Sequence, residues 1–115
     1  MKYIVAVIQP DRLNEVVDEL DKCDIHLVTV TQVMGHGRQK GEAEVYRGHK
    51  EAGRFLRKVK LEIAVNDEFV DKAVSAITGG AKTEGGTIGD GKIFVLNLED
   101  CIRIRTEEKG HEAIG

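Results

Sequence analysis

A glycine-rich segment followed by a lysine, residues 85–92, suits the binding of phosphate. It reads Gly-Gly-Thr-Ile-Gly-Asp-Gly-Lys. Glycines permit positive φ angles and let backbone N–H groups approach an anion, so this turn and Lys92 could hold phosphate oxygens. The spacing from Gly86 to Lys92 resembles that of a P-loop, but Ile93 stands where a P-loop has the Ser or Thr that binds magnesium. In addition, this segment is expected to lead from a helix into a strand, whereas a P-loop leads from a strand into a helix. The segment is therefore either a phosphate-binding turn or a flexible connection.

A second candidate for phosphate binding is Ile102-Arg103-Ile104-Arg105. In a strand, Arg103 and Arg105 would point to the same side, about 7 Å apart. That spacing suits successive phosphates of one nucleotide, because each guanidinium offers a fork of donors. The same pattern is typical of a solvated edge strand with inward isoleucines, so both interpretations stay open.

A third candidate lies at the start of a long stretch without regular periodicity. Residues 35–41 read Gly-His-Gly-Arg-Gln-Lys-Gly, and the whole stretch 35–54 is charged and contains five glycines. Loops of about twenty residues are uncommon in compact domains and are usually functional or disordered. This loop is therefore the first candidate for a binding element.

The composition limits the classes of function. The chain has 115 residues, of which 41% are hydrophobic and 32% charged, which favours one globular domain. Only 4% are aromatic and Trp is absent, so a base-stacking RNA-binding surface is disfavoured. The formal net charge of −3 argues against general attraction to nucleic acid or to an anionic membrane. Between residues 36 and 60, however, eight Lys or Arg residues stand against three Glu.

Two further features predict a cytoplasmic protein. The two cysteines, Cys23 and Cys101, are too few and too far apart for a zinc motif or a disulfide framework, so we expect reduced thiols. The sequence opens with a short apolar run that resembles a strand rather than a secretory signal, and no run approaches the length of a membrane span. We therefore expect no direct insertion into a membrane.

Hydrophobic periodicity predicts two matching halves, each a strand, an acidic turn, an amphipathic helix and a further strand. The expected strands are 3–8, 26–34, 59–65 and 93–98, and the helices begin near Asp11 and Asp67, the second capped by Asn66 and ended by Gly79 and Gly80. Two such units imply an α+β fold, a ferredoxin-like split βαβ sandwich (βαββαβ), with a long flexible loop between the second and third strands. Both helices then cover one face of the sheet, and self-association could cover the other.

Five strings, in this order and at these spacings, resemble the PII signal-transduction family: GRQKG (37–41), EVYRG (44–48), LRKVKLEI (56–63), IGDGKIFV (88–95) and IRIRT (102–106). Members of that family are homotrimers of ferredoxin-like subunits. They bind ATP or ADP in clefts between subunits, sense 2-oxoglutarate and dock a long loop onto targets in nitrogen metabolism. The resemblance implies a regulator rather than an enzyme, with one domain, 1–115, that comprises a target-binding loop (36–54), a phosphate-binding loop (80–91) and a C-terminal tail (107–115).

The resemblance also implies a nucleotide site, residue by residue. The adenine and ribose side is assigned to Thr29, Gly35, Gly37, Arg38 and the backbone near Ala64. The phosphate side is assigned to Gly89, Asp90, Gly91 and Lys92 of one subunit and to Arg103 and Arg105 of its neighbour.

The same resemblance implies a metal-linked effector site. Gln39 matches the residue whose amide oxygen ligates Mg²⁺, and Lys58, with Gln39, Lys40 and Gly41, would hold the carboxylates of 2-oxoglutarate. A keto acid can chelate nucleotide-bound magnesium through hard oxygen atoms, so effector binding would depend on nucleotide and metal.

Near the loop tip, the resemblance assigns target contact to Tyr46, Arg47 and Gly48. In the family, the Arg at this place can plug the cytoplasmic pore of an ammonium transporter; nitrogen-assimilation enzymes are the other targets that the resemblance implies.

Three features depart from the family pattern or extend it. Glu51 and His49 occupy positions where many members carry a nucleotidylated Tyr and some a phosphorylated Ser, so control by small molecules is expected instead. The segment 81–87 is about two residues longer than the common form. The tail 107–115 looks like a mobile terminus, although tails of this family can fold over the cleft.

Two other functions stay open. A ferredoxin-like ATPase or phosphotransferase could use Lys92 with the arginine pair, but no residue is evidently placed as a nucleophile or general base. An RNA-binding ferredoxin-like domain would need a set of stacking aromatic side chains on its strands, and this sequence is only 4% aromatic.

Overall fold

A computed structural model of the chain describes residues 1–36, 55–87 and 89–115. The elements are, in order, β1 (Lys2–Ile8), η1 (Pro10–Arg12), α1 (Leu13–Lys22), β2 (Thr29–His36), β3 (Phe55–Val65), η2 (Asp67–Phe69), α3 (Val70–Ala81), β4 (Gly91–Asn97) and α4 (His111–Ile114). The predicted βαββαβ arrangement is confirmed. Of the long loop predicted between the second and third strands, residues 37–54 lie outside the described residues.

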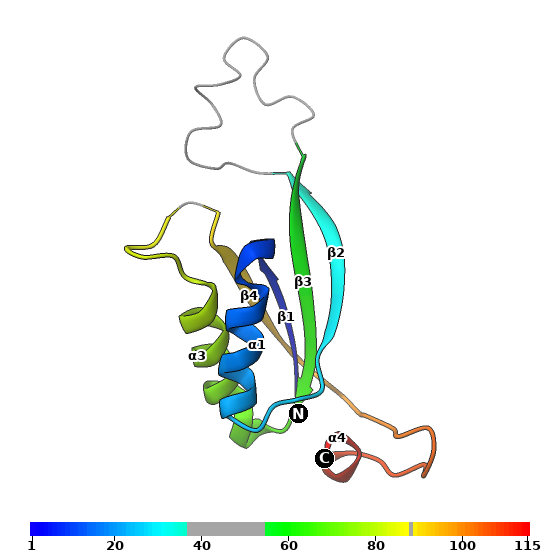
Figure 1. Ribbon diagram of the computed structural model, residues 1–115. Coiled ribbons are helices and arrows are strands. Elements are labelled where there is room, and N and C mark those ends of the chain that lie inside the picture. The colour runs from blue at the N-terminus through cyan, green and yellow to red at the C-terminus, as the bar shows by residue number, and fades with distance from the viewer. Residues whose placement is uncertain (37–54, 88) are drawn as a thin grey trace.

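The strands form one antiparallel sheet in the order β2-β3-β1-β4. Helices α1 and α3 lie side by side on one face of this sheet (Figure 1). Because side chains alternate along a strand, Ile4 of β1 and its partner Ile63 of β3 both point to the helices, where they are buried. Val16 and Leu20 of α1 complete this core from the other side and are also fully buried.

The face of the sheet away from the helices is uncovered in one chain. Phe94 and Leu96 of β4 pair with Val5 and Tyr3 of β1, so they share this face. Their side chains are 50% and 48% exposed. Large apolar side chains at such exposure mark a surface that a binding partner could cover.

Strands β2 and β3 differ from the predicted ranges at their ends. β2 begins at Thr29 rather than at 26 and continues to His36, and β3 begins at Phe55 rather than at 59. Both therefore extend together as a two-stranded ribbon toward residues 37–54. The helices in the described ranges are all too short, or too polar, to cross a membrane.

The prediction that Gly79 and Gly80 end the second helix was wrong, because α3 continues through both to Ala81. A Cβ atom on Gly80 would lie 2.7 Å from the Cα of Val16, whereas Gly79 has open space around it. Gly80 is therefore a point of close helix contact, where α1 and α3 approach each other without an intervening side chain. The guanidinium Nε of Arg12 also donates a hydrogen bond to the Gly80 carbonyl at 3.0 Å.

Both interpretations of residues 102–105 assumed a strand, and this assumption was wrong, because the chain forms a turn there. Ile102 forms only an isolated bridge with Lys109, and the intervening residues turn the chain back on itself. Glu107 occupies the left-handed region with φ 62, and its N–H donates to the Arg103 carbonyl at 2.7 Å. The alternation of Ile and Arg therefore reflects a folded-back tail and does not place both guanidinium groups on one face of a strand.

Candidate functional site

The predicted phosphate loop connects α3 to β4 at the end of the sheet where β1 finishes (Figure 1). Gly91 lies opposite Ile8 and has φ 121, a backbone conformation that favours glycine. A Cβ atom on Gly91 would overlap the Val7 carbonyl oxygen. Gly91 is thus required for β4 to begin beside β1, whatever the loop binds. A pocket of about 350 Å³ lies beneath the loop, with Asp90 and Lys92 in its lining.

Asp90 is tied into its own loop. Its Oδ2 accepts hydrogen bonds from the backbone N–H groups of Thr83 and Thr87, both at 3.1 Å. Its Oδ1 accepts from the hydroxyls of the same two threonines, at 3.0 and 3.1 Å. Burial alone would raise the pKa of Asp90, but the N–H groups of Thr87 and Thr83, helped by the hydroxyls, stabilise the carboxylate, and the pKa is lowered from 3.8.

Lys58, the predicted effector residue, lies at the same end of the molecule. It pairs with Val33 across β2 and β3, and its Nζ donates to the Gly89 carbonyl at 3.4 Å. A Cβ atom on Gly35 would lie 3.3 Å from the Cγ of Lys58. The structure therefore brings Lys58 together with Gly35 and Gly89, two residues that the sequence assigned to nucleotide.

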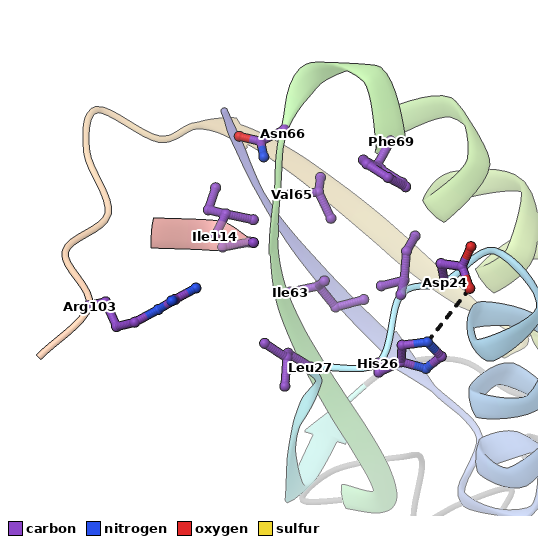
Figure 2. Close-up of a pocket in the computed structure, with 12 residues that line it drawn as sticks. Asp24, His26, Leu27, Ile63, Val65, Asn66, Phe69, Arg103 and Ile114 are labelled. Atoms are coloured by element: carbon purple, nitrogen blue, oxygen red, sulfur yellow. Dashed lines mark ion pairs between the residues drawn. The ribbon is translucent and has the colours of Figure 1, made fainter. Parts of the chain in front are cut away.

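Thr29 and Ala64 lie at the other end of the same strands. Thr29 pairs with Glu62, and Ala64 pairs with Tyr3 near the start of β1. The backbone around Ala64 lines a pocket of about 240 Å³ to which Arg103 also contributes. Figure 2 shows the Arg103 side chain extending from the tail toward the β3 side of this pocket.

The C-terminal tail holds the Arg103 guanidinium. Its Nη1 donates to the Glu108 carboxylate at 3.0 Å, and its Nη2 donates to the carbonyls of Glu112 and Ala113, both at 3.3 Å. Arg105, in contrast, is exposed, and the described residues offer it no hydrogen bond or ion pair. Only one of the two predicted phosphate-binding arginines is therefore oriented by its own chain.

The tail itself is docked, which corrects the prediction that it is mobile. Asn66 was predicted to cap the second helix, but its buried side chain makes no capping hydrogen bond. Instead, its Nδ2 donates a hydrogen bond to the His111 carbonyl at 3.2 Å. His111 Nε2 lies 2.9 Å from Glu68 Oε2, and this hydrogen bond lowers the pKa of the Glu68 carboxyl from 4.5. Ala113 is 9% exposed. The short helix α4 is thus fixed to the end of β3 and to η2.

The described candidates for nucleotide binding, together with the effector candidate Lys58, form two groups at opposite ends of the molecule. Thr29 and Gly35 lie six residues apart on β2, and a strand rises by about 3.3 Å per residue, so about 20 Å separates them. The group at one end comprises Gly35, Lys58, Gly89, Asp90, Gly91 and Lys92, and the group at the other end comprises Thr29, Ala64 and Arg103 with Arg105 beside it in the chain. One chain therefore carries two half-sites and does not gather these residues around one ligand.

The remaining predicted site residues lie outside the described residues. They are Gly37, Arg38, Gln39, Lys40, Gly41, Tyr46, Arg47 and Gly48. Glu51 and His49, for which no covalent modification is expected, lie there as well. Within the described ranges, no group of three or more His, Cys, Asp and Glu side chains could hold a metal ion. The predicted metal ligand, Gln39, is not part of those ranges.

The residues that hydrogen-bond to the candidate site residues and hold them in place were not predicted from the sequence. Thr83 and Thr87 hold Asp90, and Glu108 holds Arg103. A signal for the threonines existed, because Thr and Asp in turns commonly bond nearby backbone. For Glu108 the signal was the charge pair at a spacing of five residues, which a strand interpretation of 102–105 hides.

Comparisons with known proteins show which proteins this chain is similar to. The family model described as "Nitrogen regulatory protein P-II" matches residues 1–108. The nitrogen regulatory protein GlnK1 of Methanosarcina mazei is 52% identical over 114 residues, which cover 99% of this chain and 97% of that protein. The nitrogen regulatory protein P-II of Rhizobium etli is 52% identical, with 99% and 100% of the two chains covered.

A solved structure gives the same result for the fold. The crystal structure of Arabidopsis thaliana PII bound to citrate superimposes with a TM-score of 0.80 and 38% sequence identity, over 97% of this chain and 90% of that one.

Proposed function

The chain belongs to the nitrogen regulatory protein P-II family, and we propose that this signal-transduction regulator of nitrogen metabolism works by binding ATP or ADP, with Mg²⁺ and 2-oxoglutarate, between the subunits of a homotrimer. Its relatives are named as regulatory proteins, and the chain is a regulator rather than an enzyme. The observation that carries the proposal is the division of the nucleotide candidates into two half-sites about 20 Å apart.

The half-sites complement each other when they come from different chains. One end offers Lys92 and the backbone of the glycine-rich loop, and the other offers the Arg103 guanidinium and the Ala64 backbone. A contact between two different ends of a chain is heterologous, and such contacts close into a ring when the rotation allows. The exposed Phe94 and Leu96 on the uncovered sheet face would be buried inside that ring.

The charge distribution suits a polyphosphate at the joint. Lys92 supplies a compact positive charge from one subunit, while Arg103 supplies a planar fork of donors from the neighbour. Cations that approach the phosphates from two sides would neutralise more of their charge than either side alone, so nucleotide binding would also stabilise the assembly.

The effector site is proposed beside the phosphates, at Lys58 with Gln39, Lys40 and Gly41. The contact between Lys58 Nζ and the Gly89 carbonyl supports this, because it joins the lysine directly to the phosphate loop. The Arabidopsis PII relative is described as bound to citrate, a polycarboxylate, which is consistent with a carboxylate-binding surface in the family. A 2-oxoglutarate molecule that chelates Mg²⁺ and reaches Lys58 would therefore report on nucleotide and keto acid together.

The output is proposed to pass through residues 36–54. Tyr46, Arg47 and Gly48 are the proposed target contacts, with a cytoplasmic ammonium-transporter surface or a nitrogen-assimilation enzyme as the partner. An Arg47→Ala variant that bound a cognate transporter as well as the unaltered protein would remove Arg47 from this role.

A mixing experiment tests the division of the site. Lys92→Ala and Arg103→Ala homotrimers should each bind Mg-ATP weakly, since every cleft lacks one cation. When the two variants are unfolded together and refolded at equal amounts, about one cleft in four should regain both cations and bind ATP with the unaltered affinity. A mixture with Lys72→Ala in place of Lys92→Ala is the control, because Lys72 lies on the exposed side of α3.

Three results would count against the proposal. If calorimetry found no high-affinity clefts in the mixture, Lys92 and Arg103 would not come from different chains. A stable monomer in sedimentation at micromolar concentration would remove the cleft altogether. Binding of 2-oxoglutarate without nucleotide, or its failure to bind when Mg-ATP is present, would contradict the metal-linked effector site.

A further inference from the structure

Asp90 has a role in the phosphate loop that its position in the sequence motif does not reveal. We infer that Asp90 is a positioning residue, which closes the loop through Thr83 and Thr87 and so fixes the loop backbone that precedes Lys92, without touching the nucleotide itself. This inference rests on the proposed nucleotide-binding function.

The hydrogen bonds of the Asp90 carboxylate carry the inference. Both of its oxygens are occupied by donors from two residues of its own loop, Thr83 and Thr87. The backbone closes the same ring, because Gly86 N–H donates to the Thr83 carbonyl at 2.8 Å and Asp90 N–H donates to the Thr87 carbonyl at 3.2 Å. The two threonine hydroxyls also lie 3.0 Å apart. Thr83, Gly86, Thr87 and Asp90 are therefore joined in one hydrogen-bonded unit.

Electrostatics explain why this carboxylate does not face the ligand. A bare carboxylate beside a polyphosphate would repel it, and the repulsion would be strong in a partly buried cleft. Four donors from the loop instead surround Asp90, so that its charge is balanced locally. Lys92, two residues after Asp90, is exposed on β4 opposite Val7 and is the cation that can face the phosphates.

The hydrogen bonds of Asp90 with Thr83 and Thr87, called the clamp below, also compensate for the extra length of segment 81–87. Gly85 and Gly86 both have positive φ angles, 78 and 73, and produce a bend that returns Thr87 to Asp90. Without Thr87, the longer segment would be held to Asp90 only through Thr83. Thr87 is thus the residue by which this chain keeps a compact phosphate loop despite its length.

The experiment compares Asp90→Asn and Thr87→Val with a matched control, Glu84→Gln. Glu84 is an exposed carboxylate of the same loop and makes no hydrogen bond or ion pair among the described residues, so this control removes the same charge without opening the clamp. Hydrogen exchange at the Thr83 and Thr87 amides is measured without nucleotide, and the affinities for ATP and Mg-ATP are measured by calorimetry.

In Asp90→Asn, both amides should exchange at least about tenfold faster and the affinity should fall about tenfold, because a hydrogen-bonded charged acceptor is lost. Thr87→Val should weaken binding by about threefold although Asp90 is intact, since it removes one neutral hydroxyl donor. The loss should be the same with and without Mg²⁺, and Glu84→Gln should match the unaltered protein in both measurements.

Each other outcome decides against one part of the inference. Unchanged exchange in Asp90→Asn would overturn the clamp. Faster exchange with unchanged affinity would overturn its positioning role. A loss in Asp90→Asn that appears only with Mg²⁺, and that Thr87→Val does not reproduce, would make Asp90 a metal contact instead. Failure of the unaltered protein to bind any adenine nucleotide would overturn the proposed function, while the exchange rates would still decide the clamp.

Discussion

The contact between α1 and α3 gives a sharp test of the packing, because two adjacent glycines of α3 differ only in what surrounds them. A Cβ atom on Gly80 would lie 2.7 and 2.9 Å from the Cα and N atoms of Val16, and 3.0 Å from the carbonyl carbon of Glu15. These are backbone atoms of α1, so no side-chain rotation can relieve the overlap. On Gly79, the same atom would meet nothing within 4 Å.

The expected free energies of unfolding follow from two opposing terms. Replacing Gly by Ala inside a helix stabilises it by about 1 kcal/mol, or somewhat less near its end. Overpacking of a close contact costs about 1 to 3 kcal/mol, because the two helices must separate and loosen the core around them. The net effect of Gly80→Ala should therefore be a loss of up to about 2.5 kcal/mol, whereas Gly79→Ala should gain about 0.5 to 1 kcal/mol.

Urea unfolding followed by circular dichroism measures both variants, at one fixed subunit concentration because association adds to apparent stability. The two midpoints should lie on opposite sides of the midpoint of the unaltered protein. A Gly80→Ala variant as stable as Gly79→Ala would show that α1 and α3 do not approach as closely as the structure has them, and that Gly80 only reflects the end of a helix.

Three further predictions concern the loop and the tail. Gly91→Ala should unfold at lower urea concentration and bind ATP more weakly, because its Cβ would displace the start of β4 from the Val7 carbonyl; unchanged affinity in calorimetry would contradict this. The hydrogen bond from His111 lowers the pKa of Glu68, so it stabilises the docked tail above pH 4.5 and is lost as the pH falls through the lowered pKa. Amide chemical shifts of α4 should follow that titration in NMR and should not do so in Glu68→Gln. Arg103→Lys should accelerate amide exchange in α4, since one ammonium group cannot reproduce the fork between carboxylate and helix carbonyls, whereas a similar rate would make the tail independent of this residue.

Most of the scaffold was predictable from local patterns. Alternation along 59–65 and the 3.6-residue stripe beginning near Asp11 each report a face that must be buried, and the structure buries those faces against each other. The local sequence pattern gave the wrong prediction where a residue contacts an element that is distant in the sequence. Gly80 looks like a helix terminator in the local sequence, but a glycine is needed there because the backbone of Val16 in α1 lies so close. The tail reads as an exposed segment, but Asn66 and Glu68 hold it from 45 and 43 residues away in the chain.

The candidate site was predictable in its residues but not in its arrangement. The glycine-rich loop and the arginines carry recognisable donor chemistry, and their motifs indicate a family. No periodicity shows that Thr29 and Gly35 lie on one strand with about 20 Å between them, because that distance depends on where the strand begins and ends. A strand over 102–105 would place both guanidinium groups on one face, whereas in the structure Arg103 bonds to Glu108 and Arg105 is exposed.

The engagement of Arg103 by its own tail bears on how a neighbour could use it. The bonds to Glu108 and to the α4 carbonyls occupy Nη1 and Nη2, while Nε makes no hydrogen bond within the described residues. The guanidinium therefore keeps donors for a phosphate while its position is already set. A side chain that is ordered before binding loses less conformational entropy when the ligand arrives. For the proposed cleft, α4 therefore belongs to the binding site, although none of its residues was predicted to contact the nucleotide, and any change that detaches the tail from Asn66 should weaken nucleotide binding through Arg103.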